Sequence, residues 1–294
     1  KVLFFLFLNL TMRLIGFRKD CLWTYNPLTA QIISINDFKK SIYHAVDSIQ
    51  DQPEMPSEII KKKEKILCKL VDKVFVTSPG LRGTLAPYSK SIIYQPNCCD
   101  FDHFNQALSI NKNDIPLDIA CINRPRIGFI GAISNYKLDF KMIEEIAKKS
   151  PDLNFIFIGP TCEGEKDTQI DFLEKLENIH FLGYRPYKDL PNYCAAFDIA
   201  WLPLLINNYT QSMFPMKFFE YLASGLPVVT SSIKSLSKYN EIASLCPNES
   251  LSFIDSFRSI LIDPNYNLSQ RLEVSRMNTY SERTKLMLLE IDSI

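Results

Sequence analysis

"PMKFFEYLASGLPVV", residues 215–229, predicts a helix that begins at Pro215 and ends at Gly225, followed directly by a short Val-Val strand. Its only lysine and its only acid, Lys217 and Glu220, stand three residues apart on one face of an otherwise apolar helix. The N–H groups of the first turn and a lysine beside them predict an anion site, with phosphate as the expected anion. Glu220, one turn deeper, could accept hydrogen bonds from vicinal hydroxyls such as those of a ribose. The alternative is a surface ion pair worth only roughly 0.2–0.5 kcal/mol.

Around this stretch, short β-branched or aromatic runs alternate with helix-like segments from residue 126 onward. Such alternation predicts βαβ units and a parallel sheet, so the expected fold class is α/β. Gly131 and Gly159 end two of the strands, where glycine permits a tight turn at the edge that binds ligands in open α/β sheets. We expect strands at 126–131, 154–159, 179–183, 198–203, 227–230 and 243–246, and helices at 138–149, 168–177, 187–196, 215–224 and 232–240.

A loop of about twelve residues, "PLLINNYTQSMF" (203–214), separates the strand at 198–203 from the helix at 215. Loops this long inside compact α/β units are uncommon and often functional. This one is rich in hydrogen-bonding side chains, and we take Thr210 and Ser212 as candidate ligands of the same site.

The first 120 residues are less regular. We expect strands at 41–47, 72–78 and 90–97, and a charged helix at about 57–71 whose "KKKEK" run is interpreted as a solvated face. The polar, turn-rich stretch 105–125 is the predicted domain boundary. The expected division is 1–122, then 123–275, then a C-terminal helix at 276–294 that packs back on the first domain.

The N-terminal stretch "KVLFFLFLNLTMRLIGF" (1–17) is the most apolar part of the chain. It is shorter than the about 20 apolar residues that a membrane-spanning helix needs. We expect a buried helix of the first domain, and the alternative is contact with a membrane surface.

The charge balance and the residue counts argue against a nucleic-acid-binding protein and against a metal site. The 33 basic and 33 acidic residues cancel, which gives no support for nucleic-acid wrapping. The eight cysteines include no C-x-x-C and there are only three histidines, so no metal site is expected. Scattered cysteines are typical of a reduced, cytoplasmic protein.

Several of these stretches resemble one family. The 215–229 stretch is similar to the donor-site signature of GT-B glycosyltransferases of the group 1 (family 4-like) class, nearest the teichuronic-acid and exopolysaccharide biosynthesis transferases. Residues 126–230 match this pattern well and residues 40–290 loosely. The resemblance implies two Rossmann-like domains with parallel sheets. The segments that carry it are "IGFIGAISNYKLDFKMIEEIAKKSPDLNFIFIGP" (127–160), "NIHFLGYRPYKDLPNYCAAFDIAWLPL" (178–204), "IYHAVDS" (42–48), "KILCKLVDKVFVTSPGL" (65–81) and "YQPNCCDFDHF" (94–104).

The resemblance also implies roles for matching residues in the nucleotide-binding domain. Lys217 would contact the donor diphosphate and Glu220 the donor ribose. Gly131 would let the diphosphate or sugar approach the strand end. Tyr184 and Arg185 would lie where the family holds the base, often through main-chain atoms.

Asp47 and His44 lie where the family's N-terminal domain faces the cleft, so either would carry acid–base work or bind the acceptor. The family usually has an acid at the position of His44, and a single histidine near a strand is more often a packed residue. Ser212 stands where many retaining members carry a second glutamate, so a retaining or an inverting outcome stays open. Cys98 replaces the usual glycine of the Asn-Gly motif.

The implied reaction is transfer of a sugar from a nucleoside diphosphate sugar to a glycan or lipid-linked acceptor in cell-surface polysaccharide biosynthesis. No cofactor or metal is expected, and peripheral contact with the cytoplasmic membrane face is considered. Family members begin with a glycine-rich acceptor-binding segment, and none precedes residue 40, so the first domain is expected to be incomplete. The alternatives are a nucleotide-sugar epimerase on the same fold and a non-catalytic nucleotide-sugar-binding protein.

Overall fold

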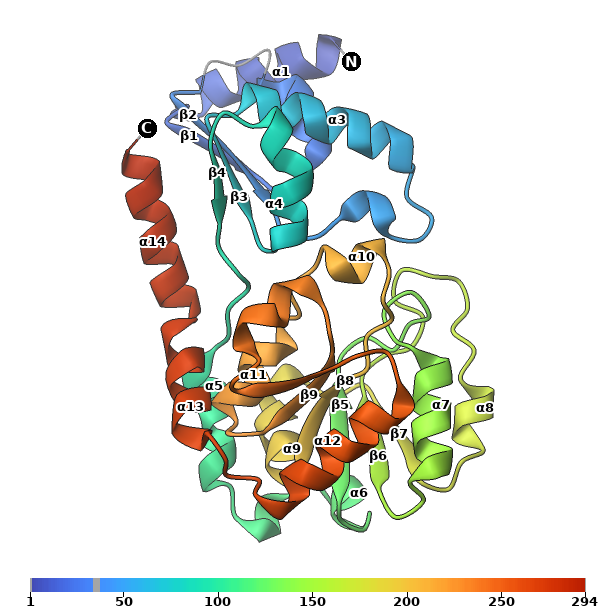
Figure 1. Cartoon of the computed structure of the whole chain (residues 1–294). Coiled ribbons are helices and arrows are strands. Elements are labelled where there is room, and N and C mark those ends of the chain that lie inside the picture. The colour runs from blue at the N-terminus through green and yellow to red at the C-terminus, as the bar shows by residue number, and fades with distance from the viewer. Residues whose placement is uncertain (1, 34–37, 294) are drawn as a thin grey trace. The chain divides into compact units, whose positions relative to one another are not determined.

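The computed structural model describes residues 2–33 and 38–293 and forms two compact units (Figure 1). The first unit comprises Lys1–Pro96 and Thr284–Ile294, and the second comprises Asn97–Arg283. Each unit contains its own parallel β-sheet.

The first unit is built on a four-stranded sheet in the order β1-β2-β3-β4. Neighbouring residues on β2 point to opposite faces, so Tyr43 packs with Leu67 of α3 while Ile42 packs with Met287 of α14. Its strands are β1 Cys21–Thr24, β2 Lys40–Ala45, β3 Lys73–Val76 and β4 Ile92–Tyr94; its helices are α1 Val2–Leu14, α2 Ala30–Ile33, α3 Ser57–Leu70 and α4 Pro79–Leu85.

The second unit is built on a six-stranded sheet in the order β10-β9-β8-β5-β6-β7, so the order of the strands reverses between β5 and β8. Open α/β sheets bind ligands beside such a switch point, at the carboxyl ends of the strands. β5, β8 and β9 are buried along their whole length, as in parallel strands covered on both faces.

The strands of this unit are β5 Arg126–Ile130, β6 Asn154–Ile158, β7 Ile179–Gly183, β8 Ile199–Leu202, β9 Val228–Ser231 and β10 Ala243–Cys246. Its helices are α5 Phe101–Asn105, α6 Leu117–Ala120, α7 Phe140–Lys149, α8 Asp171–Glu174, α9 Leu190–Ala196, α10 Asn208–Gln211, α11 Lys217–Ala223, α12 Ser250–Ile262 and α13 Leu268–Met277. α14, Tyr280–Asp292, begins in this unit and ends in the first.

Two glycines allow the ends of β5 and β6 to approach each other. Gly131 has a φ of 157° and Gly159 a φ of 149°, where L side chains are rare. A Cβ atom on Gly159 would lie 1.9 Å from the carbonyl oxygen of Gly131. Any other residue at position 159 would therefore push the two strand ends apart.

The α/β class and the expected strands are confirmed. The six strands of the second unit begin and end within one residue of their expected bounds, and β2, β3, β4 and α3 are also present. Two expected helices differ: 168–177 is helical only at Asp171–Glu174, and 232–240 forms a 3₁₀ helix at Lys234–Tyr239. β1 was not expected from the sequence.

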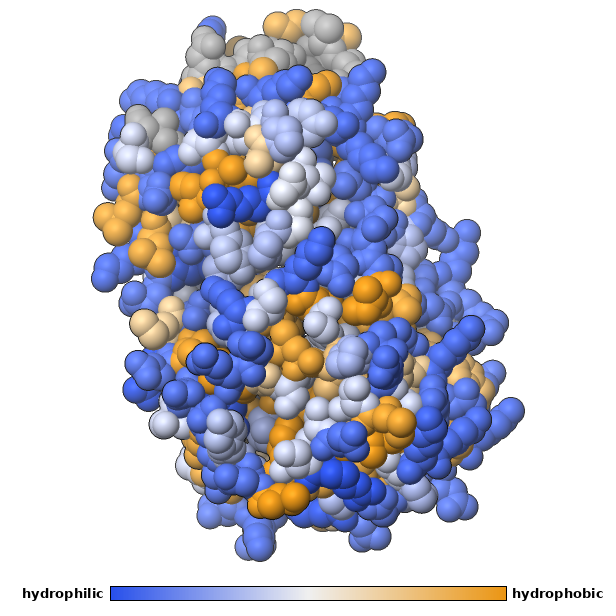
Figure 2. All heavy atoms as spheres, in the orientation of Figure 1, coloured by the Kyte–Doolittle hydropathy of each residue, from blue (hydrophilic) through white to orange (hydrophobic). Residues whose placement is uncertain are grey.

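The expected burial of the N-terminal helix is wrong. α1 is present, but Leu6, Phe7 and Leu10 are 62%, 70% and 55% exposed, whereas Met12 is buried. A helix that is apolar on all sides can place only one side against a single unit, so the others stay uncovered. In Figure 2, apolar atoms reach the surface at the top of the view, where α1 lies. None of the helices in residues 2–33 and 38–293 is long and apolar enough to cross a bilayer.

The compact units divide the chain differently from the domain ranges expected from the sequence. Residues 97–122, which were assigned to the first domain, fold with the second sheet, and Phe104 and Ile119 are part of its core. Residues 276–283 also stay with the second unit, and only Thr284–Ile294 joins the first.

Candidate functional site

A cavity of about 220 Å³ opens at the carboxyl ends of β5 and β6, beside the switch point of the second sheet. Four residues expected at the donor site from the sequence line this cavity: Gly131, Tyr184, Arg185 and Lys217. The other lining residues are Ile130, Ala132, Ile158, Gly159, Pro160, Glu163, Tyr187 and Leu190.

Lys217 is the first residue of α11 and forms an ion pair with Glu220, one turn further along the helix. The Nζ atom of Lys217 donates to Oε2 of Glu220. The Lys217 side chain is 23% exposed, whereas that of Glu220 is 1% exposed. Burial raises the pKa of Glu220, and the charge of Lys217 opposes this shift. The pair is therefore open to the cavity on the lysine side and closed on the glutamate side.

Aromatic rings hold the ammonium group of Lys217 beside the cavity. Its Nζ lies 5.5 Å from the ring centroid of Phe104 and 5.7 Å from that of Tyr187. The ring of His103 stacks on Tyr187 with 4.7 Å between centroids, and its Nε2 is 3.0 Å from the Tyr187 carbonyl oxygen. Ring faces attract cations electrostatically. These ring contacts stabilise the cation in addition to its pair with Glu220.

Arg185 is fixed by its own unit rather than directed at the cavity. Its Nε donates to the Tyr193 hydroxyl at 2.6 Å, its Nη1 to the Tyr184 carbonyl oxygen at 2.9 Å, and its Nη2 to Asp118. With the guanidinium occupied, the main chain at Tyr184 and Arg185 and the exposed Tyr184 side chain remain on this wall to contact a ligand.

A second lysine–glutamate pair lies at the cavity edge. Lys137 Nζ donates to Glu163 Oε2 at 2.5 Å, with the Glu163 side chain 55% exposed. Burial lowers the pKa of Lys137, whereas the bond to Glu163 and the nearby Tyr136 raise it. The two raising effects together exceed the effect of burial, so the net shift of the pKa is upward. This pair places a solvent-exposed carboxylate on the wall, in contrast to the buried Glu220.

The loop residues expected to bind the donor are placed differently. Thr210 is fully buried, and its hydroxyl completes a capping box with Asn207 and bonds the Leu205 carbonyl oxygen. Ser212 follows α10 as its C-terminal cap residue. Neither lines the cavity, so their assignment to the donor stays a prediction.

In the first unit, His44 lies on β2 and is 6% exposed. Its ring packs against those of Trp23, Tyr25 and Phe75, at centroid distances of 6.0, 5.0 and 6.1 Å. Asp47 follows the carboxyl end of β2 by two residues and is half-buried.

Sequence reasoning missed Glu163, Tyr187 and Leu190. Tyr187 stands two residues after Arg185, so its proximity to that candidate could have identified it, whereas Glu163 lies in a loop whose path the sequence pattern does not fix. Within residues 2–33 and 38–293, no group of three or more His, Cys, Asp or Glu side chains could hold a metal ion. The spacing Asp100–Asp102 is of the Asp-x-Asp kind, but Asp100 caps α5 by accepting from the His103 N–H.

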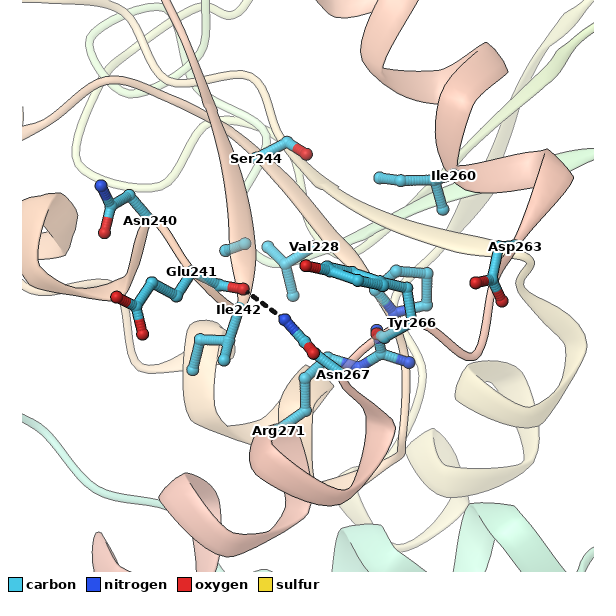
Figure 3. Close-up of a pocket in the computed structure, with 12 residues that line it drawn as sticks. Val228, Asn240, Glu241, Ile242, Ser244, Ile260, Asp263, Tyr266, Asn267 and Arg271 are labelled. Atoms are coloured by element: carbon cyan, nitrogen blue, oxygen red, sulfur yellow. Dashed lines mark hydrogen bonds between the residues drawn. The ribbon is translucent and has the colours of Figure 1, made fainter.

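A second cavity of about 120 Å³ lies at the amino ends of β9 and β10 (Figure 3). Arg271 on its wall is 3% exposed and donates to three backbone carbonyl groups, and burial lowers its pKa to about 10. Asn267 donates to the Glu241 carbonyl oxygen at 2.8 Å, the dashed line in the figure. These bonds join α13 and the loop before it to the turns that precede β9 and β10, which is a structural role.

Part of this chain is similar in sequence to known proteins. Residues 124–263 match the family model described as "Glycosyl transferases group 1". A protein of Bacillus subtilis (strain 168), TuaH, which is named as a teichuronic acid biosynthesis glycosyltransferase, is 41% identical over 112 residues. That match covers 38% of this chain and spans only 28% of the relative's own length.

Solved structures share the fold at low sequence identity. Anabaena HepE in complex with UDP has a TM-score of 0.75 at 19% identity, and the match covers 94% of this chain and 79% of that one. Sucrose-phosphate synthase from Thermosynechococcus elongatus has a TM-score of 0.74 at 16% identity, and the match covers 98% of this chain and 76% of that one. These likenesses show the GT-B fold.

Proposed function

The chain carries a group 1 glycosyltransferase domain and has the GT-B fold, and from that premise we propose that it is a sugar transferase. The donor is a nucleoside diphosphate sugar that binds in the cavity of the second unit. The acceptor is a hydroxyl group of a glycan or a lipid-linked sugar in cell-surface polysaccharide biosynthesis, the process in the name of the TuaH relative.

The observation that carries this proposal is the ammonium group of Lys217 at the wall of the 220 Å³ cavity. The cavity lies where α/β sheets bind nucleotides, and Gly131 and Gly159 form part of its wall at the strand ends. A lysine is a point charge with three donors and suits phosphate oxygens.

In the proposed reaction, Lys217 stabilises the negative charge that develops on the departing nucleoside diphosphate. Glu220 accepts hydrogen bonds from the ribose hydroxyls, and the main chain at Tyr184 and Arg185 meets the base. Because Lys217 supplies the countercharge, we expect transfer to proceed in the presence of a chelator. The HepE structures are complexes with UDP and UDP-glucose, which supports a uridine donor as the first to test.

Of the two acid–base candidates, Asp47 is better supported than His44. Asp47 stands past the carboxyl end of β2, where α/β sheets place reactive groups, whereas the His44 ring is packed among aromatic side chains. We expect Asp47→Asn to lower the rate of transfer more than His44→Phe, with the UDP affinity of both variants unchanged.

A lipid-linked acceptor would bring the protein to the cytoplasmic face of the membrane. The exposed apolar side chains of α1 support peripheral contact there.

The experiment is product analysis with a radiolabelled UDP-sugar and a membrane extract of lipid-linked glycans. A labelled glycoside supports the proposal. An epimerised donor would replace it with the epimerase function, and a donor that binds but stays unchanged would replace it with a binding function.

A further inference from the structure

The two side chains proposed to hold the donor are bound to each other in this structure. Lys217 Nζ is on Glu220 Oε2, although the proposed function places Lys217 on the diphosphate and Glu220 on the ribose. A donor phosphate that takes over the bond from Lys217 to Glu220 competes with this carboxylate. This competition has a consequence for which ligands the site accepts.

We propose that the Lys217–Glu220 pair makes the site selective for ligands that carry both a diphosphate and a vicinal diol, and that it excludes inorganic phosphate and pyrophosphate. The inference rests on the proposed function of the cavity. It assigns Glu220 a specificity role in addition to ribose binding.

The first step of the argument is the burial of Glu220. Its side chain is 1% exposed, so water cannot solvate the carboxylate if the lysine leaves. Separating a buried ion pair is strongly unfavourable when one charge is left uncompensated. Of the other charged groups facing it, His103 favours the carboxylate and Asp100 opposes it.

The second step concerns the hydrogen-bond donors that each ligand supplies to the Glu220 carboxylate. A nucleoside diphosphate brings two ribose hydroxyls, which donate hydrogen bonds to the carboxylate as the phosphates take Lys217. Pyrophosphate attracts Lys217 equally well but brings no donor for Glu220. A ligand with phosphates and no diol therefore leaves a buried acceptor without a donor, which lowers its affinity.

The third step is that Lys217 can change partners with little movement. Its side chain is 23% exposed and lines the cavity, while Phe104 and Tyr187 present their rings to the ammonium. A small displacement of the ammonium toward the cavity would leave it near these ring faces, which attract cations. The unfavourable free energy of this change of partner therefore comes mainly from the buried Glu220 carboxylate, which loses its cation.

The test is calorimetric titration of UDP, 2′,3′-dideoxy-UDP and pyrophosphate into the whole chain and into Glu220→Gln. In the wild-type protein, dideoxy-UDP should bind at least about tenfold more weakly than UDP. In Glu220→Gln, pyrophosphate should bind more tightly than in wild type, because Lys217 no longer has a carboxylate partner. The ratio of UDP to pyrophosphate affinity should fall by at least about tenfold.

Glu163→Gln is the matched control, because it neutralises a carboxylate on the same wall without touching Lys217. It should change the UDP and pyrophosphate affinities by similar factors and leave their ratio as it is. Urea unfolding of each variant checks that it is folded, and the dideoxy comparison in the wild-type protein needs no variant.

The outcomes separate the two proposals. If the wild-type protein binds no nucleoside diphosphate, the proposed function fails. If UDP binds but dideoxy-UDP binds equally well, or pyrophosphate binds Glu220→Gln no better than wild type, the donor site stands and the selectivity device is overturned.

Discussion

Each unit buries a glutamate almost completely, and the two carboxyl groups have different partners. In the first unit, Glu64 is 4% exposed and accepts a hydrogen bond of 2.5 Å from the Tyr43 hydroxyl. In the second, Glu220 is 1% exposed and pairs with Lys217. Burial raises the pKa of both. Tyr43 is itself fully buried, so no ligand can compete for it, whereas Lys217 lines a cavity. We therefore expect a ligand to compete for the partner of Glu220 but not for the partner of Glu64.

The largest expected effect is the loss of UDP affinity when Lys217, the accessible partner of Glu220, is replaced. Lys217→Ala should lower UDP affinity by about tenfold to over a hundredfold, because a charge-assisted bond to phosphate is lost. Lys137→Ala is the control: it removes the other lysine near the cavity, which is paired with the exposed Glu163. Calorimetry should show a much smaller change for Lys137→Ala. Equal losses would show that general positive charge, not Lys217, attracts the nucleotide.

Replacing Tyr43, the inaccessible partner of Glu64, should lower the free energy of unfolding rather than the affinity for UDP. Tyr43→Phe removes the hydroxyl and leaves a buried Glu64 acceptor without its donor, which should cost about 1–3 kcal/mol of unfolding free energy. UDP affinity should not change. Urea unfolding measures the first quantity and calorimetry the second. A variant as stable as wild type would mean that Glu64 is satisfied without Tyr43.

A smaller effect is expected from the charge of Glu64. Burial raises its pKa above the ordinary value of 4.5, with the Tyr43 bond opposing and Asp51 adding to the shift. The folded state therefore prefers the protonated form. The stability this contributes is full below pH 4.5 and is lost as the pH rises through the folded-state pKa.

Glu64→Gln keeps an acceptor for Tyr43 and does not titrate. Its unfolding free energy relative to that of wild type should therefore be higher at about pH 8 than at about pH 4. Urea unfolding at both pH values tests this. A constant difference between the two proteins would mean that Glu64 has the same pKa folded and unfolded.

The sequence predicted the second unit better than the first, for a physical reason. Strands such as Arg126–Ile130 and Asn154–Ile158 are buried on both faces, so they form continuous apolar runs bounded by glycine. β1 has only four residues and is mostly half-exposed or exposed, which leaves no such pattern. α1 was predicted as a helix, but what covers its faces depends on tertiary structure.

The same distinction applies to the site. Lys217 and Glu220 were identified because one helix fixes their spacing, and the structure brings them together. Their ion pair follows from the same spacing, whereas the ring contacts from Phe104 and Tyr187 and the presence of Glu163 depend on segments that converge from distant parts of the chain. Periodicity carries no information about such convergence.

The most direct test is a crystal structure of the chain with UDP, in which the distance from Lys217 Nζ to the nearest diphosphate oxygen is measured. We expect a direct contact of about 2.7–2.9 Å, with Lys217 separated from Glu220 and the ribose hydroxyls on the Glu220 carboxylate. UDP bound elsewhere, or bound with Lys217 still paired to Glu220, would contradict the proposed donor site.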